Sequence, residues 1–141
     1  MTADTTRAAL TRYLESGHSD LGILAEDVIF TTMATGEEHI GRDAVRTMLE
    51  QMYRVAFDAR AELRTLVCES EHAVLEALFV GRHTGEFAGR EATGKEVRVP
   101  FCVVYDLAGG KIRRARVYLE IPVLLAQIAP PAGVGHSAPT A

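Results

Sequence analysis

The sequence is poor in the residues that form disulfides and metal sites. It has only two cysteines, Cys68 and Cys102, which lie far apart and in no CxxC motif. We therefore expect neither a disulfide framework nor a cysteine zinc site. The five histidines form no HxH or HExxH motif and no cluster with carboxylates, so we expect no bound metal ion.

Long apolar runs and a strong net charge are also absent. The sequence has no run of 18 apolar residues and no apolar segment near the N-terminus, so we expect a cytoplasmic protein that does not enter a membrane. With a net charge of −4, the chain has no excess of basic residues that could bind a phosphate backbone, so we expect no nucleic-acid partner. The basic stretch RRAR at 113–116 is short, and we interpret it as the solvated face of a strand.

What the sequence does contain is sufficient for one domain. Its 141 residues are 48% hydrophobic and 24% charged, which is ordinary for a globular protein with a single core. The last residues are rich in Pro, Gly and Ser. We predict one domain over 1–128 and a disordered tail over 129–141.

Hydrophobic periodicity predicts helices first and strands afterwards. Helical spacing covers 5–16 and 42–57, a short helix follows Asp20, and VIFTTM at 28–33 predicts a strand. The segment 34–41 is expected to be a polar loop. After Asp58 the period changes to two, which predicts strands over 60–68, 72–84, 95–106 and 111–120, the last two joined by a turn at 108–110. A short helix should follow near Pro122. This order predicts an α+β fold, with a curved sheet closed by helices around a cavity.

Several motifs of the second half occur in a recognisable order. HTGEF (83–87), TGK (93–95), GGKI (109–112), an acidic residue and LLxQ (124–127) resemble SnoaL-like polyketide cyclases. VPF at 99–101 and the GKI hairpin also look like limonene-epoxide hydrolases, and RYLESGHSDLGILAEDVIF at 12–30 resembles ketosteroid isomerases. All belong to the nuclear-transport-factor-2-like superfamily, and the resemblance covers about residues 5–128. It implies a cone in which a curved antiparallel sheet wraps on the N-terminal helices, and chemistry without a cofactor.

The acids that these families place inside the cone are missing here. The position of the isomerase general base falls on Thr32, and that of its neutral acid falls on Cys102; neither can take over the role well. Only the isomerase tyrosine of the first helix has a match, Tyr13. The aspartate that cyclases and epoxide hydrolases keep in the last strand falls on Tyr118 or, in our preferred alignment, on Val117.

Strand alternation assigns the two faces of the last strands. Ala115, Val117 and Leu119 share one face, while Glu120 shares the other with Arg116. A hairpin that pairs Asp106 with Lys111 would put Cys102 opposite Ala115, so the predicted inner face is Pro100, Cys102, Val104, Ala115, Val117 and Leu119. Glu120 is then expected at the start of the last helix, where a carboxylate is favoured. A bulge before it would instead turn it inward as the best remaining acid.

His83 is the predicted proton carrier. Of the family's Arg-x-Asp pair, Arg82 is present and the aspartate is replaced by Thr84. The charge of Glu76 favours the set that contains Phe79 and His83 as the cavity lining, and histidine suits proton transfer near neutral pH. His39 and Glu38 lie in the loop near the expected mouth, where a solvated position is the simpler interpretation.

Two functions remain open on the sequence alone. One is a cofactor-independent cyclase, isomerase or epoxide hydrolase for a polyketide- or terpenoid-like molecule, with His83, Tyr13, Glu120 and Arg82 as candidate catalytic residues. The other is a non-catalytic module that binds such a molecule or supports dimerisation. The predicted ligand contacts are Phe30, Thr32, Met33, Met52, Phe79, Thr84, Pro100, Cys102, Val104, Ala115, Val117 and Leu119. We also predict a homodimer, because Val99, Phe101, Val103, Tyr105, Ile112 and Tyr118 would form an apolar outer face.

Overall fold

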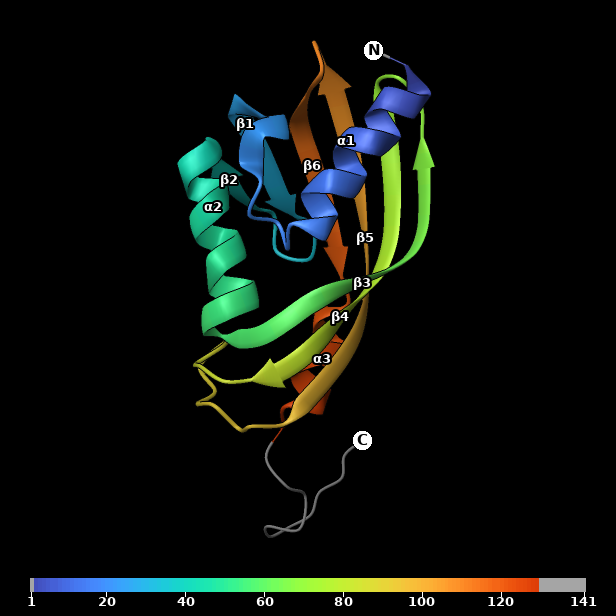
Figure 1. Cartoon of the computed structure of the whole chain (residues 1–141). Helices are drawn as coiled ribbons and strands as arrows, with labels where there is room; N and C mark the ends of the chain where they lie inside the picture. Colours follow the sequence, from blue (N-terminus) through green and yellow to red (C-terminus); the bar gives the residue numbers. More distant parts are fainter. Residues whose placement is uncertain (1, 130–141) are drawn as a thin grey trace, which may run out of the picture.

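Three α-helices and a six-stranded sheet make up the chain in the computed structural model, which describes residues 2–129 (Figure 1). The predicted tail therefore lies, apart from Ala129, outside the described residues. The elements follow one another as α1 (Ala3–Glu15), the 3₁₀ turn η1 (Leu21–Ile23), β1 (Leu24–Thr32), β2 (Glu37–Ile40), α2 (Arg42–Glu50), the π-helical turn η2 (Gln51–Val55), β3 (Phe57–Cys68), β4 (His72–His83), β5 (Glu96–Ala108), β6 (Lys111–Leu119) and α3 (Ile121–Gln127).

The strand order of the sheet is β2-β1-β6-β5-β4-β3. Neighbouring strands are antiparallel except β1 and β6, which run parallel. The α+β prediction is confirmed, as are the four long strands after Asp58. Two details differ from the prediction: the sheet is mixed because β1 lies beside β6, and part of the expected 34–41 loop forms the short strand β2.

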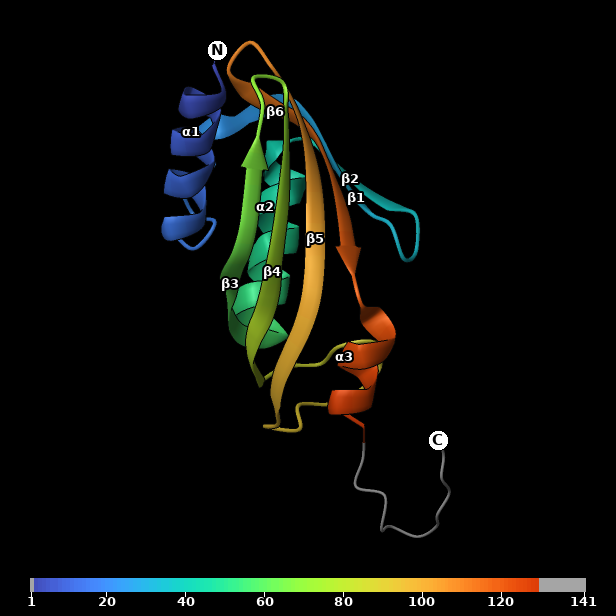
Figure 2. The same cartoon turned by 90° about the vertical axis from the view of Figure 1, so that its right-hand side faces the viewer.

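The sheet is strongly curved, and α1 and α2 lie on its concave side (Figures 1 and 2). The long strands alternate buried and exposed residues, so one face of each strand supplies the core. The Thr6 hydroxyl donates to the Ser70 carbonyl (3.2 Å) and Arg7 donates to the Leu66 carbonyl (2.9 Å), which fixes α1 to the β3–β4 hairpin. Helix α3 packs on β5, and Leu124 and Ile128 join the core.

The β5–β6 hairpin has a different register from the predicted one. Its turn lies at Gly109 and Gly110, both with positive φ, and Ala108 pairs with Lys111. An irregularity beyond Leu107 then leaves Arg113 without a counterpart, because Leu107 pairs with Ile112 and Asp106 with Arg114. Relative to the predicted pairing, β5 is displaced along β6 by three residues, because Ala115 pairs with Tyr105 instead of Cys102. A displacement by an odd number of residues exchanges the inward and outward faces of β5. Val103 lies opposite Val117, and the prediction that Pro100, Cys102 and Val104 face inward was wrong.

The same shift removes the basis of the predicted dimer face. Five of its six residues belong to the core of the protomer, and only Tyr118 is exposed, at 46%. The buried five are Val99, Phe101, Val103, Tyr105 and Ile112.

Candidate functional site

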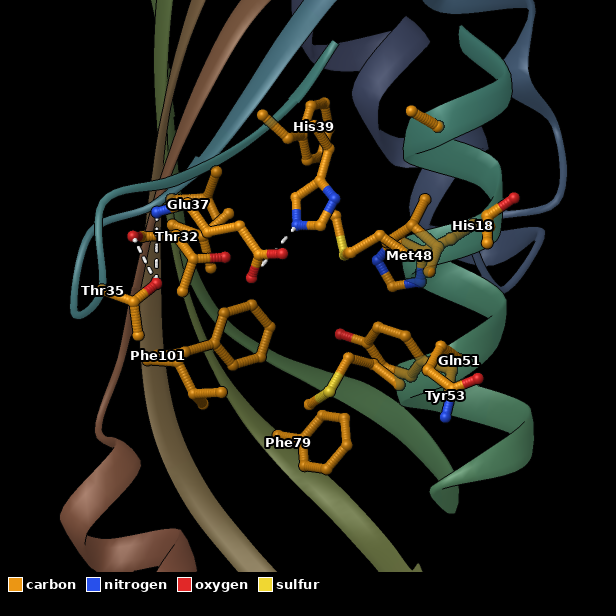
Figure 3. A pocket seen from close by; sticks show the side chains of 18 of the residues that line it. His18, Thr32, Thr35, Glu37, His39, Met48, Gln51, Tyr53, Phe79 and Phe101 are labelled. Atoms are coloured by element: carbon orange, nitrogen blue, oxygen red, sulfur yellow. Dashed lines mark hydrogen bonds and ion pairs between the residues drawn. The ribbon is translucent and has the colours of Figure 1, made fainter. Parts of the chain in front are cut away.

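A cavity of about 650 Å³ opens between the concave face of the sheet and α2 (Figure 3). Small-molecule sites commonly have volumes of about 300–1,000 Å³ and mostly apolar walls with a few polar groups. This cavity fits that description. Its apolar wall consists of Phe30, Ala44, Met48, Leu49, Met52, Phe79, Phe87, Phe101, Val103, Val117, Leu119 and Ile121.

The sheet supplies the lining in rows of cross-strand neighbours. Val103, Val117, Thr32 and Glu37 form one such row across β5, β6, β1 and β2. The adjacent inward row is Tyr105, Ala115, Phe30 and His39. Of these eight residues, all except Ala115 line the cavity.

The open end of the cavity carries Glu37 and His39. The two side chains lie on the inward side of β2, with His39 Nε2 4.0 Å from Glu37 Oε1. The Glu37 side chain is 67% exposed and that of His39 only 19%. The Thr35 hydroxyl accepts from the Glu37 N–H (3.2 Å), so the β1–β2 turn fixes the strand that carries the pair.

The closed end is lined by three tyrosines. Tyr13, Tyr53 and Tyr105 are 1%, 8% and 2% exposed, and burial raises the pKa of all three phenols. They remain protonated at neutral pH and can donate hydrogen bonds. The Tyr13 hydroxyl is buried without a hydrogen-bond partner among the described residues.

His18 lies beside these tyrosines. Its ring contacts Tyr13 edge-on at 5.1 Å and Tyr53 at 4.6 Å between centroids. Burial, and next the charge of Arg54, lower the pKa of His18 to about 4. The imidazole is therefore neutral at physiological pH.

Helix α2 and the turn η2 form the wall that faces β2. Figure 3 shows Gln51 and Tyr53 on this side and Glu37 and Thr35 on the opposite side. The π-helical turn places Gln51, Met52 and Tyr53 on the cavity within three consecutive residues, and such turns are frequent at functional sites.

His83 does not line the cavity, although it faces the core as predicted. It is fully buried and stacks on Phe57, with 5.1 Å between ring centroids. Its Nδ1 accepts from the Thr93 N–H (3.2 Å) and lies 2.9 Å from the Thr93 hydroxyl. Nε2 is buried and has no partner within residues 2–129. These contacts make His83 an anchor for the β4–β5 connection.

Glu120 and Arg82 also lie away from the cavity. Glu120 is exposed at the N-cap of α3, as the strand alternation predicted, and no bulge turns it inward. Arg82 is on the outer face, where it donates to the Gly94 carbonyl (2.8 Å) and pairs with Glu96 (3.2 Å).

The predicted ligand contacts divide into two groups. Tyr13, which was predicted as catalytic, does line the cavity, and so do six of the predicted contacts: Phe30, Thr32, Met52, Phe79, Val117 and Leu119. The remaining six do not: Met33, Thr84, Pro100, Cys102, Val104 and Ala115.

Seven polar residues of the cavity wall were not predicted from the sequence, namely His18, Thr35, Glu37, Thr47, Gln51, Tyr53 and Tyr105. If a β-hairpin after β1 had been predicted, Glu37 would have been recognised as a cavity residue, because it pairs with the inward-facing Thr32.

Within residues 2–129 no group of three or more His, Cys, Asp or Glu side chains is arranged to hold a metal ion. No helix in the described part of the chain is long and apolar enough to cross a membrane.

The comparison with known families agrees with this architecture. The family model described as SnoaL-like polyketide cyclase matches residues 16–128. The chain belongs to this family. No curated protein is significantly similar to it in sequence.

Solved structures with the same fold include three that align over nearly their whole length. A Jannaschia sp. CCS1 protein assigned to the SnoaL-like polyketide cyclases has a TM-score of 0.81 and 17% identity, over 92% of this chain and 96% of that one. A Xanthomonas campestris pv. campestris protein assigned to the polyketide cyclases has a TM-score of 0.75 and 25% identity, over 90% and 98%. A Catenulispora acidiphila protein with a ketosteroid isomerase-like fold has a TM-score of 0.70 and 16% identity, over 93% and 96%. The SnoaL-like chain thus has the nuclear-transport-factor-2-like fold.

Proposed function

We propose that this SnoaL-like protein binds an apolar, polyketide- or terpenoid-like molecule that carries a carbonyl group, and that it promotes a cofactor-independent ring closure or isomerisation of that molecule. The observation that carries the proposal is the cavity itself. Its walls are apolar, and phenol hydroxyls that stay protonated lie at the closed end. Such donors stabilise negative charge on a carbonyl oxygen.

Ring closure and isomerisation fit this cavity better than epoxide opening. The resemblance to epoxide hydrolases implies an acid at Val117, which has no polar atom. Arg82, from the same motif, points to the outer face. Enolate chemistry requires only one base and one donor, and both kinds of group line the cavity.

A non-catalytic binding protein is the second candidate. Val117 favours it, because the acid implied by the resemblance is replaced by a purely apolar side chain in the middle of the sheet row. Both candidates require ligand binding, and they differ only in whether the ligand is changed.

The experiment has a binding part and a turnover part. Purified protein is analysed by native mass spectrometry for a co-purified ligand and is titrated with the bicyclic ketone 2-tetralone while the melting temperature is followed. A bound ligand should raise the melting temperature, and the rise should continue as the ligand concentration increases above its dissociation constant. Failure of 2-tetralone and of a panel of hydroxyanthraquinones to bind, together with no co-purified molecule, would refute the proposal. Binding without any chemical change would favour the second candidate.

A further inference from the structure

We propose that His39 is the catalytic base of this cavity and that Glu37 supports it by stabilising the imidazolium that forms. The inference rests on the proposed function and names the residues that carry it. It assigns the proton transfer to β2, on the rim of the sheet, instead of to β4 or β6.

The charge inventory of the cavity leads to this pair. Among the described residues, Glu37 is the only carboxylate that lines the cavity, and His39 and His18 are its only histidines. His18 is enclosed by Tyr13 and Tyr53, and protonation there is opposed by burial. His39 lies beside the carboxylate and has access to the open end, so it can gain and lose a proton.

The geometry of β2 gives the two ring nitrogens of His39 different surroundings. Nε2 faces the Glu37 carboxylate at 4.0 Å, and no hydrogen bond to Nδ1 is present within residues 2–129. The 4.0 Å separation is too long for a hydrogen bond, but a small rotation that brings the two groups within hydrogen-bond distance would hold the proton on Nε2 and leave the other nitrogen as the base. Nδ1 is therefore the atom that would take the proton, and the Nε2–Glu37 distance can shorten when the ring becomes charged.

The groups around His39 leave this carboxylate as its only charged neighbour on the cavity wall. From β1 it is flanked by Phe30 and Thr32, and α2 contributes Ala44, Thr47 and Met48 to the lining. The titratable groups across the cavity are His18 and the three tyrosines, all neutral at physiological pH for the reasons given above.

The proton donors lie on the far side of the cavity from this pair. Tyr53 belongs to the wall opposite Glu37 (Figure 3), and Tyr13 also lines the cavity. A carbonyl compound that spans the cavity can therefore present its oxygen to a phenol and an adjacent C–H group to His39.

The proposed step conserves atoms and electrons. His39 Nδ1 takes a proton from the carbon next to the carbonyl, the C–H pair becomes a C=C bond, and the carbonyl π pair moves to the oxygen, which accepts a hydrogen bond from a tyrosine. In a ring closure the enolate carbon attacks a second carbonyl carbon of the same molecule. A C–C bond forms, the first C=O bond is restored, and the second oxygen takes the proton from the imidazolium.

The test uses 2-tetralone in D₂O and follows deuterium incorporation next to its carbonyl by proton NMR. His39→Gln should slow the protein-dependent exchange by about 100-fold or more, the lower end of general-base contributions. Glu37→Gln should slow it by about two- to fivefold, the size of a partly exposed ion-pair effect. Glu38→Gln is the matched control, because it removes the same charge from the next residue of β2, outside the cavity lining, and should leave the rate unchanged.

The pH profile separates catalysis from a structural effect. The wild-type rate should rise with pH as the base loses its proton, and His39→Gln should lose this rise. If His39→Gln is poorly folded, Glu37→Gln, which changes an exposed side chain, still tests the pair. Equal rates for the wild type and both variants, with 2-tetralone still raising the melting temperature, would overturn the assignment while leaving the proposed binding intact. Absence of exchange despite binding would also overturn it, and absence of binding would overturn both proposals.

Discussion

Val117 faces the cavity from β6 at the position where the family resemblance implies an aspartate. It is flanked by Val103 and Thr32, so the middle of the sheet row has no charge. The nearest carboxylate in that row is Glu37, two strands from Val117, which corresponds to roughly 10 Å at the usual spacing of strands. A single apolar replacement thus moves the available acid–base groups from the centre of the sheet to its rim.

Tyr13 offers a prediction about stability and binding. Its hydroxyl is buried without a partner among the described residues, and such a group costs about 1–3 kcal/mol of desolvation. Tyr13→Phe should therefore leave the melting temperature unchanged or raise it, while weakening the binding of 2-tetralone. Thermal unfolding and a binding titration measure the two effects. Tyr118→Phe, which changes an exposed tyrosine outside the cavity, is the control. A marked fall in the melting temperature of Tyr13→Phe would show that the hydroxyl is satisfied in the folded protein.

The lowered pKa of His18 predicts that the folded protein loses stability in acid. Its pKa is lowered to about 4 in the folded state, whereas an unfolded histidine titrates near 6.5. Between these values the unfolded chain binds a proton that the folded protein does not, so this residue makes stability fall as the pH decreases from about 6.5 to about 4. Below pH 4 its contribution to the slope ends.

The variant His18→Asn tests this pH dependence. Asparagine tolerates the positive φ of 66° at this position and does not titrate. Melting temperatures measured from pH 7 to pH 4 should fall less steeply for the variant than for the wild type, whatever the change in stability at pH 7. Parallel curves would mean that His18 is protonated as easily in the folded protein as in the unfolded chain.

At the scale of elements, α3 begins where β6 ends, and Glu120 occupies its N-cap. The side chain makes no capping hydrogen bond and is exposed, so its effect is the attraction between a carboxylate and the helix N-terminus. Glu120→Gln should reduce stability slightly, by roughly 0.3–1 kcal/mol. It should leave ligand turnover unchanged. Melting curves and deuterium exchange on the same sample check this, and a loss of exchange with an unchanged melting temperature would make Glu120 the acid after all.

The hairpin of β1 and β2 is the element that converts a simple helix-and-sheet cone into a candidate active site. Its turn is held by the Gly36 N–H, which donates to the Thr32 carbonyl (2.8 Å), and by the Thr35 hydroxyl, which accepts from Glu37. Without this hairpin, the cavity would have no carboxylate in its lining.

At the scale of the whole molecule, the outer face of the sheet carries a patch of partly exposed apolar side chains, defined by Val74, Leu78, Cys102, Val104 and Tyr118, with Glu76 and Arg116 beside them. Val74 is 38% exposed and pairs with Val104, while Tyr118 pairs with Cys102. A patch of this kind commonly marks a protein interface. We therefore retain the prediction of a homodimer and move its interface to this patch.

Light scattering tests the dimer. We expect a mass twice the 15.3 kDa of the chain at micromolar concentration. Tyr118→Glu should shift the protein toward the monomer, because it places a charge in the patch, whereas Val55→Glu in η2, away from the outer face of the sheet, should not. A monomeric wild type, or equal behaviour of both variants, would contradict an interface at this patch.

The sequence by itself determined the elements and the fold class. Alternation and helical spacing are local properties, so the strands after Asp58, the helix at 42–57 and the inward set that contains Phe79 and His83 could all be predicted. Alternation also placed Val117 inside and Glu120 outside, because both depend only on the phase of one strand.

Only the tertiary structure decided which side chains meet at the cavity. One unpaired residue, Arg113, exchanges the faces of β5, and no local pattern reveals a single irregularity of this kind. His83 points to the core as expected, but its ring packs against Phe57 and does not reach the cavity. The sequence alone indicates a solvated loop at Glu37 and His39. The four residues of β2, three of them polar, acquire an inward face only from pairing with β1.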